Sequence, residues 1–160
     1  MTTVAYAAVT QSGLSFDRQL WMRPEIIPGL RRLTDAIHAE GAAAGIQLGH
    51  CGNMSHKSIC GCMPVGASSG FNLYSPTFVR GLRADELPEM ARAYGRSVNL
   101  AREAGFDSVE IHAGHGYLIS QFLSPSTNHR KDEFGGSLEN RMRFMDLVME
   151  EVMKGAGSDI

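Results

Sequence analysis

The stretch VEIHAGHGYLISQFLSPSTNHRKDEFGGSLENRMR, residues 109–143, decides the fold. It begins as an apolar strand, passes His112, His115 and Tyr117, and continues through a long polar loop into a helix. This order is typical of an α/β barrel, in which reactive groups lie just past the carboxyl end of a parallel strand. Two imidazoles and a phenol at one strand end predict a site that handles protons or hydrogen bonds.

Strands and helices alternate along the rest of the chain as well. Short apolar runs predict buried strands, and apolar residues at helical spacing predict helices. Residues 50–83 are rich in Gly, Ser, Pro and Cys, and are expected to be mostly loop, long enough for a lid or a binding loop. The expected strands are 4–9, 44–48 and 109–111, and the expected helices begin at Pro24, near Leu87 and near Leu138, the last with Ser137 as its N-cap.

This order predicts an α/β fold whose parallel strands are joined by right-handed crossovers. A full (β/α)8 barrel needs about 250 residues and eight strands, whereas only three strands are predicted here. The first helix is expected to bury one face, and most methionines of the last helix are expected to pack in the core. That face comprises Ile27, Leu30, Leu33, Thr34 and Ile37, and the methionines are Met142, Met145, Met149 and Met153.

The composition narrows the class of protein. Of 160 residues, 43% are hydrophobic and 20% are charged, which is typical of a soluble domain with a core. The formal net charge of −2 and the lack of a basic stripe argue against nucleic-acid binding, and no apolar run is as long as a membrane span. No secretory signal is visible, so the three cysteines, Cys51, Cys60 and Cys62, indicate a reduced, cytoplasmic setting.

His112 and His115 allow three interpretations. As metal ligands they need a third group, for which His50, Cys51 or Glu110 is available, and the protein would then be a metal-dependent hydrolase. As paired N–H donors they would stabilise negative charge on a substrate carbonyl oxygen. As structural residues, one would cap the strand and the other would be solvated.

Three further features each have a chemical and a structural interpretation. Tyr117 is a fair proton donor to a carbanion or enolate, or else a core aromatic beneath the loop. The amide of Gln47, at the end of the second strand, suits the edge of a pyrimidine-like ring, or else it bonds backbone. Cys60-x-Cys62 is not C-x-x-C and has no second pair to complete a metal site, so it is expected to be a pair of loop thiols.

A family resemblance chooses among these interpretations. HAGHGYLISQFLSPSTNHRKDEFGGSLENRMRF closely resembles the signature of the old yellow enzyme family of flavin oxidoreductases, and IQLGHCGN resembles its second hallmark. The resemblance covers nearly the whole chain. It implies part of a (β/α)8 TIM barrel, about strands 2–4 with their helices, as a single domain over residues 1–160. It also implies FMN at the carboxyl ends of the strands, and NADH or NADPH as the reductant.

The resemblance implies a role for each candidate residue. His112 and His115 would hold the carbonyl oxygen of a small-molecule enone or enoyl substrate above the flavin, which His112 would also contact. Tyr117 would protonate the α-carbon, and Gln47 would hydrogen-bond the pyrimidine edge of the flavin. The implied activity is that of an FMN-dependent NAD(P)H oxidoreductase of the ene-reductase type. Asn128, Arg130, Asp132, Glu139 and Arg141 also match the signature and are expected to shape the loop.

The sequence also departs from the family pattern. Asn53 stands where the family often has Arg, and the later strands, with their basic residue and phosphate site, are expected to lie outside these 160 residues. The alternative is therefore a catalytically incomplete barrel fragment. Such a fragment would act only by association through its exposed strand edges, for example as a homo-oligomer, or would not act at all.

Overall fold

A three-stranded parallel sheet lies at the centre of the computed structural model, which describes residues 1–157. The strands are hydrogen-bonded in the order β1 (Thr2–Ala8), β2 (Ala44–Gly49) and β6 (Ser108–Ile111). In β2 and β6, Gln47 lies opposite Glu110 and Leu48 lies opposite Ile111. The three predicted strands are confirmed. Because they are parallel, their carboxyl ends meet at one edge of the sheet.

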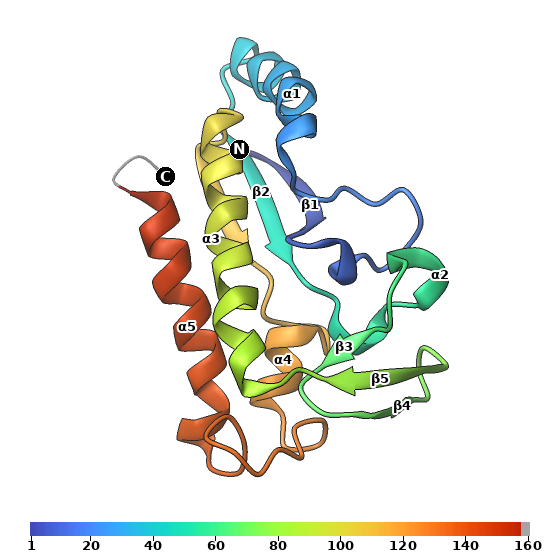
Figure 1. Ribbon diagram of the computed structural model, residues 1–160. Coiled ribbons are helices and arrows are strands. Elements are labelled where there is room, and N and C mark those ends of the chain that lie inside the picture. Colours follow the sequence, from blue (N-terminus) through green and yellow to red (C-terminus); the bar gives the residue numbers. More distant parts are fainter. Residues whose placement is uncertain (158–160) are drawn as a thin grey trace.

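The long helices pack on one face of this sheet. They are α1 (Ile27–Ala39), α3 (Leu87–Glu103) and α5 (Leu138–Ala156), and α3 and α5 lie side by side (Figure 1). Ile46 and Leu48 of β2 and Val98 of α3 are fully buried in the common core, and each such side chain contributes about 1.5–3 kcal/mol. Ser137 caps α5 as predicted, because its Oγ accepts the Asn140 N–H at 3.2 Å.

Two expectations about helix faces are wrong. Leu33 is 40% exposed on α1, and three of the four methionines of α5 are exposed, with only Met145 packed against the core. Two apolar stripes run along α5 at helical spacing. The stripe made of phenylalanine and valine side chains packs inward, and the stripe made mostly of methionines faces outward. The exposed methionines are Met142, Met149 and Met153, and the inward residues are Phe144, Val148 and Val152.

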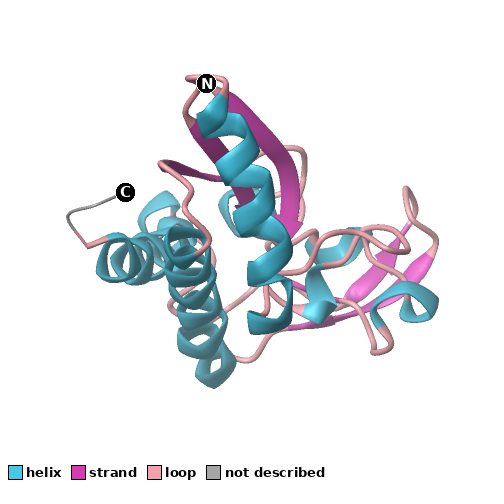
Figure 2. Ribbon diagram, turned by 90° about the horizontal axis from the view of Figure 1, so that it is seen from above, coloured by secondary structure: helices cyan, strands magenta, loops and turns pink. Residues whose placement is uncertain are grey.

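Residues 50–83 contain more structure than the sequence predicts. A short helix, α2 (Lys57–Cys60), precedes a small sheet with the strand order β3-β5-β4, which stands apart from the long helices (Figure 2). Strands this short show no periodicity, so the sequence pattern cannot reveal them. The strands are β3 (Val65–Gly66), β4 (Gly70–Asn72) and β5 (Thr77–Gly81).

The remaining elements are short. Helix α4 (Leu118–Leu123) follows residues 112–117, the histidine loop, and buries Leu118 and Phe122. No helix within residues 1–157 is both long and apolar enough to cross a membrane. The 3-10 turns are η1 (Gln11–Gly13), η2 (Pro24–Ile26), η3 (Gly52–Met54) and η4 (Ala84–Glu86).

Helices α3 and α5 touch through two glycines. A Cβ atom added at Gly155 would lie 2.5 Å from the carbonyl oxygen of Gly95, and one added at Gly95 would lie 2.7 Å from the carbonyl oxygen of Glu151. Both contacts are to backbone, so neither can be relieved by turning a side chain. The two helices can therefore pack this closely only without side chains at these positions.

Replacing Gly155 by Ala is expected to lower the free energy of unfolding by about 1–3 kcal/mol, because the helices must move apart. This loss should exceed the gain in helix propensity from Gly to Ala. Urea unfolding followed by circular dichroism measures it. Gly29→Ala in α1 is the matched control, since its Cβ would meet only Arg32 Nη2 at 3.8 Å. If both variants lost the same stability, close packing at Gly155 would not be the cause.

Candidate active site

One face of the central sheet carries the candidate residues. On β2, Gln47 is half-buried and alternates with the fully buried Ile46 and Leu48, so it points away from the helices. Glu110 lies opposite Gln47 on β6. His112 is two residues beyond Glu110 and therefore shares its face, at the carboxyl end of the strand.

The two predicted histidines come together at this edge. The backbone N–H of His112 donates to the Leu48 carbonyl oxygen at 2.8 Å, and this bond extends the hydrogen-bonded ladder between β2 and β6. The chain then turns back through His115, whose φ of +58° lies in the left-handed region that non-glycine residues rarely adopt. This turn brings His115 Nδ1 to 3.2 Å from His112 Nε2. Backbone strain of this kind, about 1–3 kcal/mol, is typical of functional loops.

Two tyrosines complete a four-ring cluster, which comprises Tyr6, His112, His115 and Tyr117. The Tyr117 ring stands edge-on to His112, with centroids 5.0 Å apart, and edge-on to Tyr6 at 5.3 Å. Tyr6 OH donates to Gly13 O at 2.7 Å, which fixes this ring. The Tyr6 ring can lie against β2 because Gly49, which follows Gln47 on the same face of the strand, has no side chain. A Cβ atom at Gly49 would lie 2.6 Å from Tyr6 Cε2.

The His112 ring is uncharged at neutral pH, because its pKa lies below the usual value. Burial, and after it the neighbouring His115 ring, holds the pKa of His112 below its usual value, while Glu110 opposes the shift. A neutral imidazole keeps one N–H donor and one acceptor nitrogen. The ring pair can therefore offer N–H groups to an oxygen atom.

Gln47 lies on the same face but outside the four-ring cluster. Its Nε2 donates to Glu110 Oε1 at 2.6 Å, across the strand pair. From the sequence, Glu110 is expected only as a possible metal ligand, and its contact with Gln47 is seen only in the structure. The bond orients the amide and uses one of its two N–H groups, so the other N–H and Oε1 remain for a ligand.

Gln121 of α4 supports the site, and it is not among the residues that the sequence predicts there. Its buried Nε2 donates to Gly116 O at 2.6 Å and to Asn53 Oδ1 at 2.9 Å, and its Oε1 accepts the Asn53 N–H at 3.2 Å. The amide thus ties the histidine loop to the loop after β2. Asn53, which stands where the family often has Arg, both donates to and accepts from the Gln121 amide. The one available signal was a polar residue inside the apolar run LISQFL.

His50 lies beneath the site and is fully buried. Gly52 N–H donates to its Nδ1 at 2.9 Å, so the ring proton is on Nε2, which lies 3.0 Å from Ser12 Oγ. Both nitrogens are therefore used within the fold. In the part of the chain that the structure describes, residues 1–157, no three His, Cys, Asp or Glu side chains come together as a metal site.

His50 is expected to make the protein sensitive to acid. Burial lowers its pKa from 6.5 to about 3, so between these values the unfolded chain binds a proton that the folded chain excludes. Stability is therefore lost as the pH falls below 6.5, by about 2 kcal/mol on reaching pH 5. Urea unfolding at pH 6.5 and at pH 5 measures this loss of stability. His50→Gln should lose less over this range, and the exposed His129→Gln should lose as much as wild type. The same loss in His50→Gln would contradict this origin.

Comparisons with known proteins identify relatives of this chain. A model of the NADH:flavin oxidoreductase / NADH oxidase family matches residues 1–160. The chain is 40% identical over 160 residues to the 4,4'-dithiodibutanoate disulfide reductase of Rhodococcus erythropolis, covering 100% of this chain and 40% of that protein. It is 39% identical over 150 residues to the NADPH dehydrogenase of Bacillus subtilis, covering 93% of this chain and 44% of that protein.

Solved structures show the same relationship. An old yellow enzyme homologue from Zymomonas mobilis superposes with a TM-score of 0.91 at 33% identity, covering 98% of this chain and 48% of that one. Morphinone reductase in complex with tetrahydroNAD gives 0.89 at 29% identity, covering 97% and 48%. The chain thus spans about half, or less, of the proteins it matches. The likeness confirms the predicted α/β fold with the parallel strands of a TIM barrel.

Proposed function

Because the chain belongs to the NADH:flavin oxidoreductase / NADH oxidase family, we propose that it carries the carbonyl-binding and proton-donating groups of an ene-reductase site. Family membership supports FMN as the cofactor and NADH or NADPH as the reductant. The observation that carries the proposal is the four-ring cluster, in which two imidazole nitrogens lie 3.2 Å apart beside a phenol. The complete reaction is proposed for the whole protein, since the chain spans about half the length of its relatives or less.

The residues on the sheet face fit FMN. The free Oε1 and N–H of Gln47 match the pyrimidine edge of a flavin, which has both donors and acceptors. Gly45 and Gly49 flank Gln47 on this face, and Tyr6 packs over Gly49, so Gln47 is the long polar side chain that β2 presents here. When bound, FMN would supply the hydride to the β-carbon of the alkene.

His112 and His115 would bind the carbonyl oxygen of the substrate. Hydride addition to a conjugated alkene builds negative charge on this oxygen, so donors placed there stabilise the transition state more than the ground state. The two ring nitrogens already converge, at 3.2 Å, on the same region. A carbonyl oxygen that entered between them would replace their mutual contact with two N–H donors.

Tyr117 would donate the proton to the α-carbon. Its ring stands edge-on between Tyr6 and His112, so the phenol is held beside the carbonyl site. Tyr6 is a positioning residue, because its hydroxyl is committed to Gly13 O and burial raises its pKa above the usual value. Of the two phenols, Tyr117 is the one free to give up a proton.

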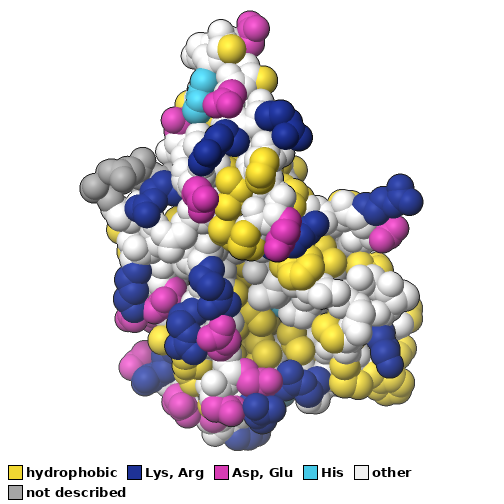
Figure 3. Space-filling model, turned by 45° about the horizontal axis from the view of Figure 1, so that its top comes forward, with side chains coloured by type: hydrophobic (Ala, Val, Ile, Leu, Met, Phe, Trp, Pro, Cys, Tyr) yellow, Lys and Arg dark blue, Asp and Glu magenta, His cyan; other side chains and the backbone are white. Residues whose placement is uncertain are grey.

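The substrate would carry an apolar substituent. A cavity of about 500 Å³ beside His115 is lined by Met54, Phe71, Leu73 and Tyr74. The last three belong to the β4–β5 hairpin and expose much of their surface, and hydrophobic side chains gather at the side of the molecule where this hairpin projects (Figure 3). Exposed apolar patches of this kind are typical of binding surfaces. The cavity would hold an alkyl or aromatic group of the alkene.

Titration of the purified protein with FMN, followed by quenching of flavin fluorescence, tests the proposal. Saturable binding is expected, and Gln47→Leu should weaken it about tenfold, the equivalent of one lost hydrogen bond. Asn99→Leu, which removes an exposed amide from α3, is the matched control and should bind as wild type does. A folded protein that takes up no FMN at millimolar concentration, or that binds it equally well without Gln47, would overturn the proposed site.

A further inference from the structure

Two cysteines outside the candidate site lie unusually close together. Helix α2 ends at Cys60, and the next residue, Gly61, has a φ of +73°. This left-handed turn, which glycine adopts at no steric cost, folds the chain so that Cys62 returns toward Cys60. The two Sγ atoms are 3.6 Å apart, and Cys62 is placed to donate to Cys60. A disulfide needs about 2.05 Å, so closure requires a movement of about 1.5 Å.

The two thiols differ in access. Cys60 is 2% exposed, and its Sγ lies 3.2 Å from both His56 O and Cys62 O. Cys62 is exposed and lines an open cavity together with Met63 and Arg80. An outer thiol that a reagent can reach and an inner thiol that it cannot reach are the two parts of an attacking and resolving pair.

We propose that Cys60 and Cys62 form a redox-active dithiol that reacts with low-molecular-weight organic disulfides. The Cys62 thiolate attacks one sulfur of the organic disulfide, forms a mixed disulfide and releases one thiolate. The Cys60 thiol, losing its proton, then attacks Cys62 Sγ and releases the second thiolate. The chain gives up two electrons and two protons and ends with a Cys60–Cys62 disulfide, and the organic disulfide becomes two thiols.

Cys51 takes no part in this pair. It is fully buried, its Sγ donates to Leu14 O at 3.3 Å, and burial raises its pKa to about 12. Burial, and after it the hydrogen bond to Cys60, also raises the pKa of Cys62 to about 11. Because the thiolate is the attacking form, the rate should rise about tenfold per pH unit between pH 7 and 10.

The experiment incubates the protein with oxidised glutathione, without FMN or nicotinamide, so that only the thiols of the chain can react. Titration should show a fall from three free thiols to one, with the loss of two hydrogens in the intact mass. Peptide mapping should find the link between Cys60 and Cys62, and dithiothreitol should restore all three thiols. Failure of flavin binding would leave these outcomes unchanged, so the two proposals can fail separately.

Single variants identify the role of each sulfur. Cys60→Ser should accumulate a stable mixed disulfide on Cys62, Cys62→Ser should react far more slowly, and Cys51→Ala should behave as wild type. Three thiols that persist at pH 9 in excess oxidised glutathione would overturn the proposal. So would a stable glutathione adduct on the wild-type chain, or a mapped link to Cys51. Mapping of the wild-type chain keeps the test decisive if a variant does not fold.

Discussion

Replacing Tyr117 by Phe is expected to slow the reduction of a conjugated alkene by a factor of about 10²–10⁴, the usual contribution of a positioned proton donor. The ring packing against His112 and Tyr6 would survive, since only the hydroxyl is removed. Reduction of bound flavin by NADH or NADPH should keep its rate, because that step needs no proton at the α-carbon. Stopped-flow absorbance of the flavin separates the two half-reactions in the FMN-loaded protein.

Tyr94→Phe is the matched control for Tyr117. Tyr94 is fully buried in α3, it belongs neither to the four-ring cluster nor to the cavity beside His115, and within residues 1–157 its hydroxyl has no hydrogen-bond partner to lose. Both half-reactions of this variant should stay close to wild type. Equal slowing of both half-reactions in Tyr117→Phe would show that the phenol supports the site in general and is not the proton donor.

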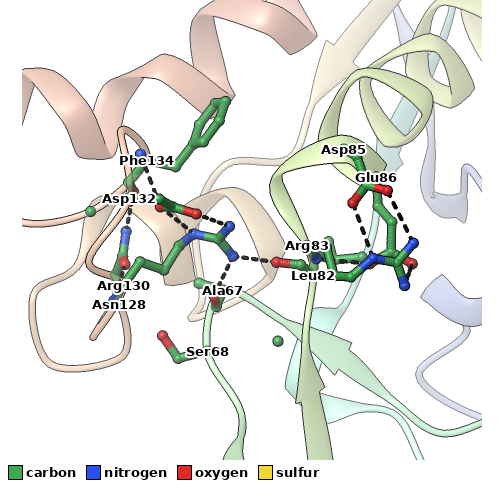
Figure 4. Close-up of polar contacts among 12 residues, drawn as sticks. Ala67, Ser68, Leu82, Arg83, Asp85, Glu86, Asn128, Arg130, Asp132 and Phe134 are labelled. Atoms are coloured by element: carbon green, nitrogen blue, oxygen red, sulfur yellow. Dashed lines mark hydrogen bonds and ion pairs between the residues drawn. The ribbon is translucent and has the colours of Figure 1, made fainter.

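Replacing Arg130 by Ala is expected to cost about 3–5 kcal/mol of stability, a large part of the 5–15 kcal/mol that holds a typical domain folded. The guanidinium is 8% exposed and forms a bidentate pair with Asp132, with Nε–Oδ1 and Nη2–Oδ2 distances of 2.9 and 2.5 Å. It also donates to Ala67 O at 3.0 Å and to Leu82 O (Figure 4). Its loss leaves two carbonyl groups without this donor and leaves the Asp132 carboxylate with only the Phe134 N–H, at 3.2 Å, from this network.

Arg83→Ala provides the control within the same view. Arg83 pairs with Asp85 and Glu86, but its side chain is 66% exposed, so water replaces the lost contacts and the stability should stay close to that of wild type (Figure 4). Urea unfolding of both variants measures the difference. Arg130→Lys should fall between them, because one ammonium cannot reproduce the planar fork. Equal losses for Arg130→Ala and Arg83→Ala would contradict a structural role for the Arg130 network.

The central sheet and the long helices can be predicted from the sequence. The three strands of the central sheet and the long helices have clear periodicity, and Ser137 stands directly before an apolar helical pattern. The small sheet in residues 50–83 was missed because strands of two to five residues have too few positions to show alternation. The methionine stripe of α5 was misplaced because spacing identifies a face, whereas packing decides which of two apolar faces is buried.

Part of the candidate site can be predicted from the sequence and part cannot. His112, His115 and Tyr117 lie within six residues of one another, so one loop brings them together and the sequence reveals the group. Tyr6, Glu110 and Gln121 join the site through strand register and a loop contact, with partners seven to 68 residues away. Such partners depend on how strands align, which a single sequence does not record. The expected loop role of Arg130 agrees with its buried contacts.

The left-handed backbone at His115 limits which residues evolution can place there. The position requires a residue that tolerates a φ of +58° and, for the proposed carbonyl site, still offers a side-chain N–H beside His112. Glycine satisfies the backbone but has no side-chain donor, and aspartate tolerates the conformation but only accepts hydrogen bonds when ionised. Asparagine meets both requirements. Asparagine is therefore the substitution at this position that is expected to keep both the turn and a side-chain donor.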